Sequence, residues 1–290
     1  MKVLVIGSTV VDVILNVEKM PQLGEDENVV SQDLSVGGCA YNVSHTLRYL
    51  HVDNDLFSPI GQGIYGDYIR DHFIDNNLDI LLESQEKNGC CYCIVDHSGE
   101  RTFLALHGCE YIYKKEWFQS IQKENYDAIY VCGLELEEKS GHIICDFLKN
   151  AQNVFFAPSS RICYLKQDIM NRMFALKPVV HLSLNELLSY TQCSSVEQGA
   201  RYLYLKTKQL VIVTLGDKGC YYFDGQDHYI AGFPCQVVDT IGAGDCHLAA
   251  FMAYHLQGLS NEEALLKANY LSSLVVGQKG SKLDINRKVV

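Results

Sequence analysis

The sequence predicts an α/β protein whose mainly parallel central sheet is covered by helices on both faces. Short apolar runs typical of buried strands alternate with amphipathic stretches typical of helices along most of the chain. The 290 residues, of which 48% are hydrophobic, can bury a substantial core. With 5 prolines and 22 glycines, the composition excludes collagen-like and broadly disordered proteins.

The predicted elements follow one another in a regular order. Six apolar runs are the expected strands of the central sheet: 2–7, 56–61, 126–133, 153–158, 179–183 and 209–216. Amphipathic spacing predicts helices that begin near residues 39, 66 and 243, and further helices over 138–150, 166–176, 185–191, 196–207 and 264–276.

Two regions depart from this alternation. Residues 10–35 and 89–107 each predict a pair of strands with period-two patterning, as in a half-exposed sheet. We expect the two regions to form one small sheet that projects from the main domain. The first strand has an apolar face, with Val11, Val13 and Leu15, that needs a cover, so a homodimer through this sheet is one hypothesis. The last residues, 284–290, are expected to fray.

Charge and hydropathy limit the partners. The formal net charge of −11 and the absence of a Lys/Arg cluster argue against nucleic-acid binding. No apolar run approaches the roughly 20 residues that span a bilayer. The apolar start of the chain is interrupted by Gly7, Ser8 and Asp12 and lacks a small-residue cleavage site, so it predicts a buried strand rather than a signal peptide. We therefore expect a cytoplasmic protein.

The 12 cysteines do not form a metal-binding pattern. The one close group, Cys90, Cys91 and Cys93, contains no CxxC pair, whereas a zinc site typically uses two such pairs. Most cysteines lie in apolar runs, where cysteine behaves as a small hydrophobic residue. We expect free thiols in a reducing compartment.

The strongest functional signal is Gly242-Ala243-Gly244-Asp245, at the junction of a strand end and a helix. The glycines let the backbone approach a ligand, and the helix start presents free N–H groups that can bind phosphate without any basic side chain. Asp245 lies in the first helical turn, beside this anion hole. A carboxylate there can accept a proton from an attacking hydroxyl.

At this point the sequence resembles the ribokinase-like carbohydrate kinases of the PfkB family, over essentially the whole chain. DTIGAGD (239–245) is similar to the C-terminal signature of that family, and no Walker loop is present. Other matches are shorter. They are Asp12 after the first strand, Gly37-Gly38 with Asn42 as a substrate motif, TLGDKG (214–219) as a nucleotide-phosphate loop, and Asn269 near the nucleotide.

The resemblance implies a three-layer α/β/α domain over 1–290, with the regions 10–35 and 89–107 as a β-sheet lid. It implies transfer of the γ-phosphoryl group of ATP to a substrate hydroxyl, with Mg²⁺ arriving with ATP. Asp245 is the expected base, and the amides of Gly242, Ala243 and Gly244 the expected anion hole. The residues expected to bind the substrate are Asp12, Gly37, Gly38 and Asn42. The residues expected to bind the nucleotide are Asn185, Thr214, Gly216, Gly219 and Asn269. Asp239 matches a monovalent-cation position, which leaves potassium use open.

Two segments depart from the family pattern. The N-x-x-E motif here is Asn185 to Leu188, without its glutamate, and a helix is expected to turn Glu186 about 160° away from the motif face. The segment APSSR (157–161) keeps only the arginine of a DPNxR motif.

A GxGxxG motif at 61–66 is typical of dinucleotide-binding proteins, but here it follows the second strand rather than the first.

The acceptor is expected to be an unphosphorylated sugar. GGCAYN carries no Lys, and the lid offers few cations besides Lys19 and Arg101, whereas a sugar phosphate needs basic side chains near its phosphate. A nucleoside is the alternative, because Tyr41, Tyr92 and Phe103 could form a slot for a base. A second alternative is a catalytically weak sensor that binds a sugar or nucleotide.

Overall fold

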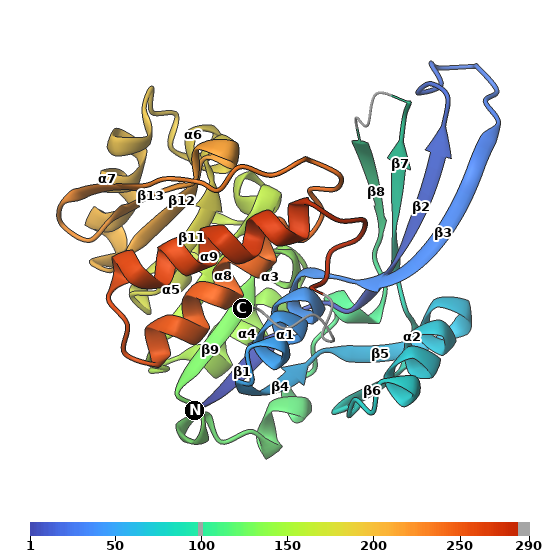
Figure 1. Ribbon diagram of the computed structural model, residues 1–290. Helices are drawn as coiled ribbons and strands as arrows, with labels where there is room; N and C mark the ends of the chain where they lie inside the picture. The colour runs from blue at the N-terminus through green and yellow to red at the C-terminus, as the bar shows by residue number, and fades with distance from the viewer. Residues whose placement is uncertain (98–100, 284–290) are drawn as a thin grey trace.

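A computed structural model describes residues 1–97 and 101–283 of the chain. Its largest part is an eight-stranded sheet with the order β14-β13-β12-β11-β10-β9-β1-β4 (Figure 1). Six neighbouring strands are parallel, and β13 and β14 form an antiparallel hairpin at one edge. The strands are β1 (Lys2–Ile6), β4 (Asp53–Phe57), β9 (Ala128–Cys132), β10 (Val154–Ala157), β11 (Val179–Ser183), β12 (Val211–Thr214), β13 (Cys220–Phe223) and β14 (Asp227–Ile230).

Helices cover both faces of this sheet, because apolar side chains point alternately to either side of each strand. In β1, Val3 and Val5 pack into one hydrophobic cluster and Leu4 and Ile6 into the other. One face carries α1 (Cys39–Tyr49), α8 (Ala243–Leu256) and α9 (Asn261–Val276). The other carries α4 (Gly141–Leu148), α5 (Gln167–Ala175), α6 (Leu184–Thr191) and α7 (Val196–Thr207). Short helical segments are α3 (Leu134–Glu137), η1 (Cys109–Tyr111), η2 (Lys115–Ser120), η3 (Lys123–Asn125), η4 (Ser159–Cys163) and η5 (Gly216–Lys218).

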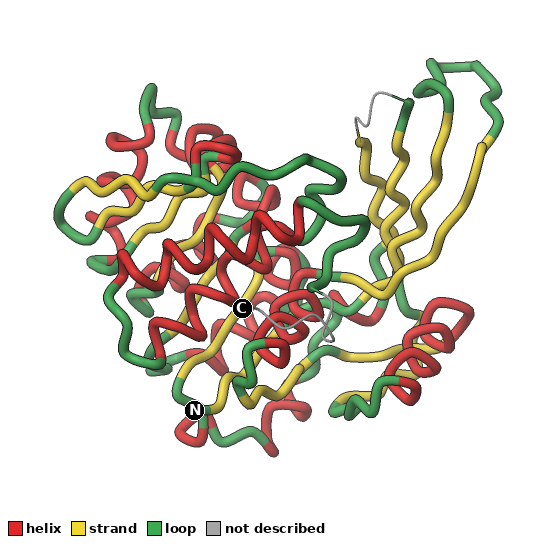
Figure 2. Tube along the Cα trace, viewed as in Figure 1, coloured by secondary structure: helices red, strands yellow, loops and turns green. Residues whose placement is uncertain are grey.

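A second, four-stranded sheet stands away from the main domain (Figure 2). Its order is β3-β2-β7-β8, with β2 parallel to β7 and the other pairs antiparallel. The strands are β2 (Val10–Val17), β3 (Val29–Gly37), β7 (Cys90–Val95) and β8 (Arg101–Leu106). The two separate regions of the sequence therefore join in one small sheet, as the period-two patterning predicted. We call this sheet the lid.

The apolar face of the lid is covered by the same chain. Helix α2 (Gly63–Asp75) packs against it, so that Val11 and Val13 are buried. The hydroxyls of Tyr65 in α2 and Tyr92 in β7 lie 3.0 Å apart. The valines that suggested a homodimer through this face are therefore already buried within one chain.

Some elements differ from the prediction. The apolar run 56–61 is divided between β4 and a separate strand β5 (Pro59–Gln62), which pairs with β6 (Leu82–Lys87). Neither β6, which is polar, nor the four-residue strands β13 and β14 have a pattern long enough to reveal them in the sequence. Residues 98–100, expected between the strands of the second pair, and residues 284–290, expected to fray, lie outside the described residues.

The GxGxxG segment has a packing role in this fold. It joins β5 to α2 in the two-stranded sheet rather than in the central sheet. A Cβ atom on Gly66 would lie 2.1 Å from the carbonyl oxygen of Gly61. The glycines therefore allow close contact between β5 and α2, and the segment is not the first turn of a dinucleotide-binding unit.

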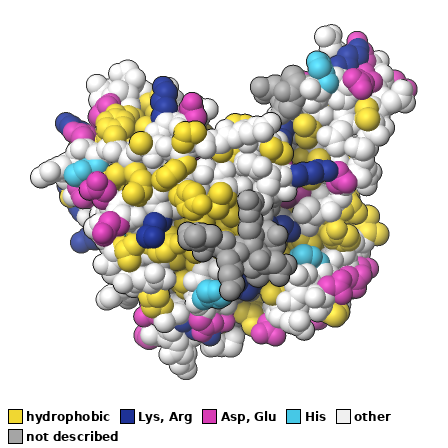
Figure 3. Space-filling model, viewed as in Figure 1, with side chains coloured by type: hydrophobic (Ala, Val, Ile, Leu, Met, Phe, Trp, Pro, Cys, Tyr) yellow, Lys and Arg dark blue, Asp and Glu magenta, His cyan; other side chains and the backbone are white. Residues whose placement is uncertain are grey.

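None of the described helices has the length and apolar character of a membrane span. On the face shown in Figure 3, Lys and Arg side chains are scattered among Asp and Glu rather than gathered in a basic patch.

Candidate active site

The first turn of α8 is the centre of the candidate site. Gly242 caps the helix in the left-handed region, with φ of 75°. A Cβ atom there would lie 2.5 Å from the Cβ of Ser281, so both the conformation and the space require glycine. A Cβ on Gly244 would meet no atom within 4 Å, because this residue faces open space. The 14-residue helix thus presents its first-turn amides to a cavity, as an anion site requires.

Asp245 is held in this turn by a residue from another helix. Asn42 of α1 donates a hydrogen bond of 2.9 Å from Nδ2 to Asp245 Oδ2, and Ser281 Oγ donates to Asn42 Oδ1 at 2.9 Å. Burial raises the pKa of Asp245 to about 6, and the hydrogen bonds from Asn42 and Cys39 oppose that rise. The carboxyl group can therefore accept a proton near neutral pH.

Three cavities meet at this turn, and Gly242, Gly244 and Asp245 form their shared walls. The lid cavity, of about 450 Å³, lies between the lid and α8. The central cavity, of about 380 Å³, lies over the ends of β9, β10 and β11, and the loop cavity, of about 570 Å³, lies beside α9. Gly242 and Asp245 line the lid and central cavities, whereas Gly244 lines the central and loop cavities. A group bound in the central cavity would therefore contact Asp245 and the helix start together.

The lid cavity contains most of the residues expected to bind a substrate. Asp12, Gly38 and Asn42 line it. Burial raises the pKa of Asp12 to about 7, while the positive charge of Lys282 opposes the rise. Gly37 lies behind the wall: a Cβ on Gly37 would come within 2.0 Å of Asp12 Oδ2, so this glycine makes room for the carboxylate.

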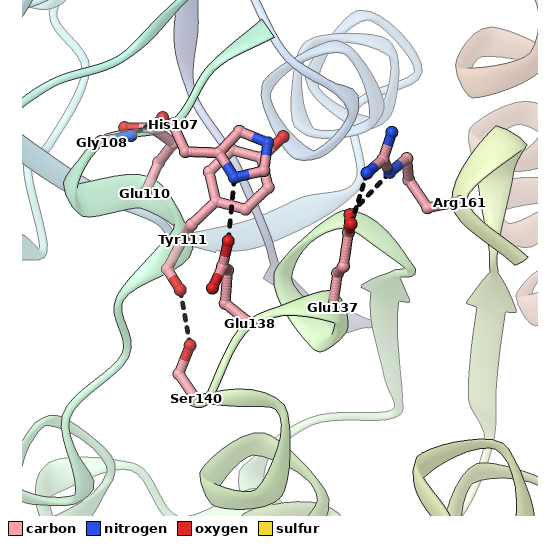
Figure 4. A network of polar contacts seen from close by, with 8 residues as sticks. All are labelled: His107, Gly108, Glu110, Tyr111, Glu137, Glu138, Ser140 and Arg161. Carbon is pink, nitrogen blue, oxygen red and sulfur yellow. Dashed lines mark hydrogen bonds and ion pairs between the residues drawn. The ribbon is translucent and has the colours of Figure 1, made fainter. Parts of the chain in front are cut away.

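Three residues that line the lid cavity, His107, Tyr111 and Arg161, belong to the polar network shown in Figure 4. The ring of His107 stacks on Tyr111 with centroids 3.7 Å apart, and His107 Nδ1 lies 3.1 Å from Glu138 Oε1. Arg161, the arginine that remains of the DPNxR pattern, forms a two-point ion pair with Glu137, with Nε 2.6 Å from Oε2. The basic groups of this network are thus paired with carboxylates.

The loop cavity contains four of the five residues expected to bind a nucleotide. Thr214, Gly216, Gly219 and Asn269 line it together with Ala243 and Gly244. Asn269 is fixed from behind, since its amide donates to the carbonyl of Ala231 at 3.0 Å and its Oδ1 lies 2.9 Å from His247 Nε2. Apolar side chains such as Phe233 and Val237 form the rest of the wall.

Asn185 is the expected nucleotide-binding residue that lines none of the three cavities. It is exposed near the start of α6. Glu186, in contrast, lines the central cavity beside Asp245. The expectation that Glu186 turns away was wrong, because its side chain folds back over the helix start.

A capping box explains the position of Glu186. Glu186 Oε2 accepts a hydrogen bond of 2.8 Å from the amide of Ser183, and the Ser183 hydroxyl caps the amide of Glu186. The spacing Ser183-x-x-Glu186 was readable in the sequence. The oxygen donors of the central cavity, which include Glu186, Asp245, Thr214 and Thr240, are of the type that Mg²⁺ prefers.

Both carboxylate oxygens of Asp239 accept hydrogen bonds from nitrogen atoms. Arg101 of the lid donates from Nη1 to Asp239 Oδ1 at 2.6 Å, and both side chains are largely buried. The amides of Ile241 and Gly280 donate to the two carboxylate oxygens at 2.8 and 3.0 Å. In this structure the guanidinium group of Arg101 thus compensates the negative charge of Asp239. Arg101 lies 138 residues away in sequence, so no local pattern indicates the contact.

Comparisons with known proteins agree with this architecture. Residues 1–288 match the family described as pfkB family carbohydrate kinase. YegV of Escherichia coli K12, described as an uncharacterized sugar kinase, is 31% identical over 286 residues, which cover 96% of this chain and 89% of YegV.

Solved structures show the same fold. Ribokinase from Thermotoga maritima superposes with a TM-score of 0.83 at 20% identity, covering 96% of this chain and 94% of that one. A double mutant of fructokinase from Vibrio cholerae, solved with fructose, ADP and a potassium ion, has a TM-score of 0.75 at 20% identity, covering 98% and 94%. These likenesses confirm the predicted main domain with a mostly parallel sheet and a small separate lid sheet.

Proposed function

Since the chain belongs to the pfkB family of carbohydrate kinases, phosphotransferases that act on hydroxyl groups, we propose that it transfers the γ-phosphoryl group of ATP to an unphosphorylated sugar. In this proposal the sugar binds in the lid cavity and ATP in the loop cavity. The phosphoryl group passes through the central cavity, in front of the first turn of α8.

The position of Asp245 carries the proposal. Its carboxyl group forms part of the wall between the lid cavity and the central cavity, where an acceptor hydroxyl and a phosphoryl group would meet. A general base needs this placement and a pKa near the working pH, and burial raises the pKa of Asp245 to about 6. The amides of Gly242, Ala243 and Gly244 would stabilise charge on the transferred group.

The charges around the lid cavity favour an acceptor without a phosphate. Within the described part of the chain, Arg161 is the one Lys or Arg that lines this cavity, and Glu137 neutralises it. Arg101, the other nearby cation of the lid, is paired with Asp239. Lys282, whose charge acts on Asp12, donates a hydrogen bond of 2.8 Å to the backbone carbonyl of Val36. A sugar phosphate would have to displace one of these contacts to obtain a charge-assisted hydrogen bond. A neutral sugar needs only hydrogen-bonding groups such as Asp12 and Asn42.

Glu186 is the residue proposed to hold Mg²⁺ in place of the missing glutamate of the N-x-x-E motif. One of its oxygens is used by the helix cap, and the carboxylate lines the central cavity. The bound metal would neutralise phosphate charge. Mg²⁺ commonly retains several waters and binds through few carboxylates, so one glutamate is a sufficient protein ligand.

We propose that Arg101, rather than a potassium ion, compensates the negative charge of Asp239. The guanidinium group already compensates the buried carboxylate at a distance of 2.6 Å. This contact also joins the lid to the loop that leads into α8.

A nucleoside is the second candidate acceptor. Phe103 and Leu106 of the lid line the lid cavity, and the stacked rings of His107 and Tyr111 form a flat wall on another side. A base could pack against these surfaces, since aromatic faces stack on flat rings. The cavity of about 450 Å³ is large enough for either compound.

Acceptor-dependent formation of ADP tests the proposal. A panel of free sugars, nucleosides and sugar phosphates is assayed with the wild-type chain and with Asp245→Asn. We expect kcat to fall by about 10² to 10⁴-fold in the variant, while the thermal shift caused by an ATP analogue stays the same. Asn can still accept the hydrogen bond from Asn42, so the fold is preserved.

The outcomes separate the candidate functions. Turnover of a nucleoside alone would select the second candidate. Binding without turnover of any compound by the wild-type chain would instead indicate a sensor. A variant that retains most of its rate would refute the role of Asp245 as base.

A further inference from the structure

Three potential metal ligands from different strands lie together on the inner face of the lid. Asp12 of β2 is paired in register with Cys91 of β7, and Cys93 follows two residues later on the same face. One oxygen of Asp12 and the two sulfur atoms all lie within 4.8 Å of one another. The two cysteines lack the CxxC spacing that is typical of a zinc site. In a strand, however, CxC places both thiols on one side.

The distance between the sulfur atoms matches a tetrahedral metal centre. Cys91 Sγ and Cys93 Sγ lie 3.8 Å apart. Two thiolates bound to Zn²⁺ at about 2.3 Å with a tetrahedral angle are separated by about 3.8 Å. The pair therefore needs little rearrangement to bind one ion. Thiolate ligands select zinc and related soft ions over Mg²⁺ and Ca²⁺.

The surroundings provide the remaining features of such a site. Asp12 and Cys91 line the lid cavity, so a fourth position is open to water or to a ligand. The charges that act on the cluster are the negative charges of Asp239 and Asp245 and the positive charges of Lys282 and Arg101. The negative charge of Asp12 and a thiolate would be compensated by a divalent cation.

We propose that Asp12, Cys91 and Cys93 form a site for a thiophilic divalent cation such as Zn²⁺, and that the bound ion blocks the lid cavity. Binding of the metal depends only on these three side chains. Inhibition rests on the proposed function, because it follows from the use of Asp12 by both the ion and the acceptor. The site thus makes the enzyme sensitive to free zinc.

Titration with Co²⁺, a spectroscopic substitute for Zn²⁺, tests the binding without any assay of activity. The reduced, metal-free full chain is titrated while the thiolate-to-cobalt charge-transfer absorption is recorded. We expect one Co²⁺ per chain, with displacement by Zn²⁺. Cys91→Ser and Cys93→Ser should each weaken binding by at least about tenfold, since even loss of an outer-sphere partner of a metal ligand has effects of this size.

Cys163→Ser is the matched control, because Cys163 is a free and exposed cysteine outside the cluster. It should leave the titration unchanged. Absence of the charge-transfer band in the wild-type chain would overturn the site, as would a band that persists in both Cys91→Ser and Cys93→Ser or is lost in Cys163→Ser. Circular dichroism spectra of the variants verify that they are folded.

A separate assay tests the consequence. Zn²⁺ should inhibit phosphorylation competitively with the acceptor in the wild-type chain, and about tenfold more Zn²⁺ should be needed in Cys91→Ser. If no acceptor is phosphorylated, the proposed function fails while the cobalt titration still decides the metal site. Inhibition that is equal in wild type and Cys91→Ser would refute the blocking role.

Discussion

The first turn of α8 and the lid cavity are adjacent, but they are built in different ways. The helix turn consists of four consecutive residues, Gly242 to Asp245, and uses backbone amides and one carboxylate. The lid cavity collects side chains from β2, α1, β7, β8 and η4, which are far apart in sequence. The one Lys or Arg among the described residues that line it, Arg161, is paired with Glu137.

Because of this difference, we expect the helix turn to determine the rate of phosphoryl transfer and the lid cavity to determine which acceptor is used. An anion site made of backbone serves any phosphoryl group, irrespective of the sugar that receives it. Acceptor choice depends on which side chains of the lid cavity remain free to bind a ligand. We therefore expect changes in the helix turn to lower kcat for every acceptor, and changes in the lid cavity to alter selectivity.

Gly242→Ala should have the largest effect among the changes that leave Asp245 in place. The added Cβ would clash with Ser281 and strain a residue with φ of 75°, so the anion hole would be displaced. We expect kcat to fall by about 10² to 10³-fold, as when an oxyanion donor is removed. Gly258→Ala is the matched control, because Gly258 has φ of 90° and open space around it. An equal loss of kcat in both variants would show that backbone strain alone is responsible.

The pH profile of kcat/KM reports the state of the base. Burial raises the pKa of Asp245 to about 6, and a base works only when deprotonated. The rate should therefore be constant above this pKa and fall by about tenfold per pH unit below it. A profile that stays flat down to pH 4 would contradict the assignment, provided that circular dichroism shows the fold intact there.

Glu186→Gln tests the metal ligand in the central cavity. Glutamine can still accept the hydrogen bond from the amide of Ser183, so α6 keeps its cap, but the negative charge is lost. The Mg²⁺ concentration at half-maximal rate should rise by about tenfold. Glu263→Gln, in the equivalent capping box of α9, should leave it unchanged, because Glu263 lines none of the three cavities. An unchanged Mg²⁺ requirement in Glu186→Gln would remove Glu186 from the metal site.

Arg101→Gln tests the ion pair of Arg101 with Asp239, which joins the lid to the loop before α8. Without the guanidinium group, Asp239 remains buried with amide donors alone. We expect the variant to be stimulated about fivefold by K⁺ over Na⁺, because an added cation can compensate a buried charge that has lost its partner. The wild-type rate should depend little on the choice of salt. Strong K⁺ activation of the wild type would show that Arg101 leaves this position during turnover.

The helix turn could be predicted from the sequence, whereas the lid cavity could be predicted only in part. The turn is formed by neighbouring residues, and the cavity by residues that are far apart in the chain. DTIGAGD is contiguous, and Gly242 to Asp245 have roles that follow from their position at a helix start. The contact of Arg101 with Asp239 spans 138 residues and depends on how the lid folds over the main domain. The position of Glu186 was misjudged because an ideal helix was assumed at a residue whose side chain forms a cap. Asn185, expected to bind a nucleotide from its motif, is exposed outside the cavities.

The ratio of kcat/KM for a free sugar to that for its phosphate ester tests the account most directly. Both compounds contain the hydroxyl that is phosphorylated. The ratio therefore measures how the additional phosphate charge affects binding in the lid cavity. Because Glu137 neutralises Arg161, we expect a ratio of at least about 10² in favour of the free sugar, the size of effect seen when a charged group lacks a partner in a buried site. A ratio below one would contradict the account and would mean that the paired cations open to bind a phosphate.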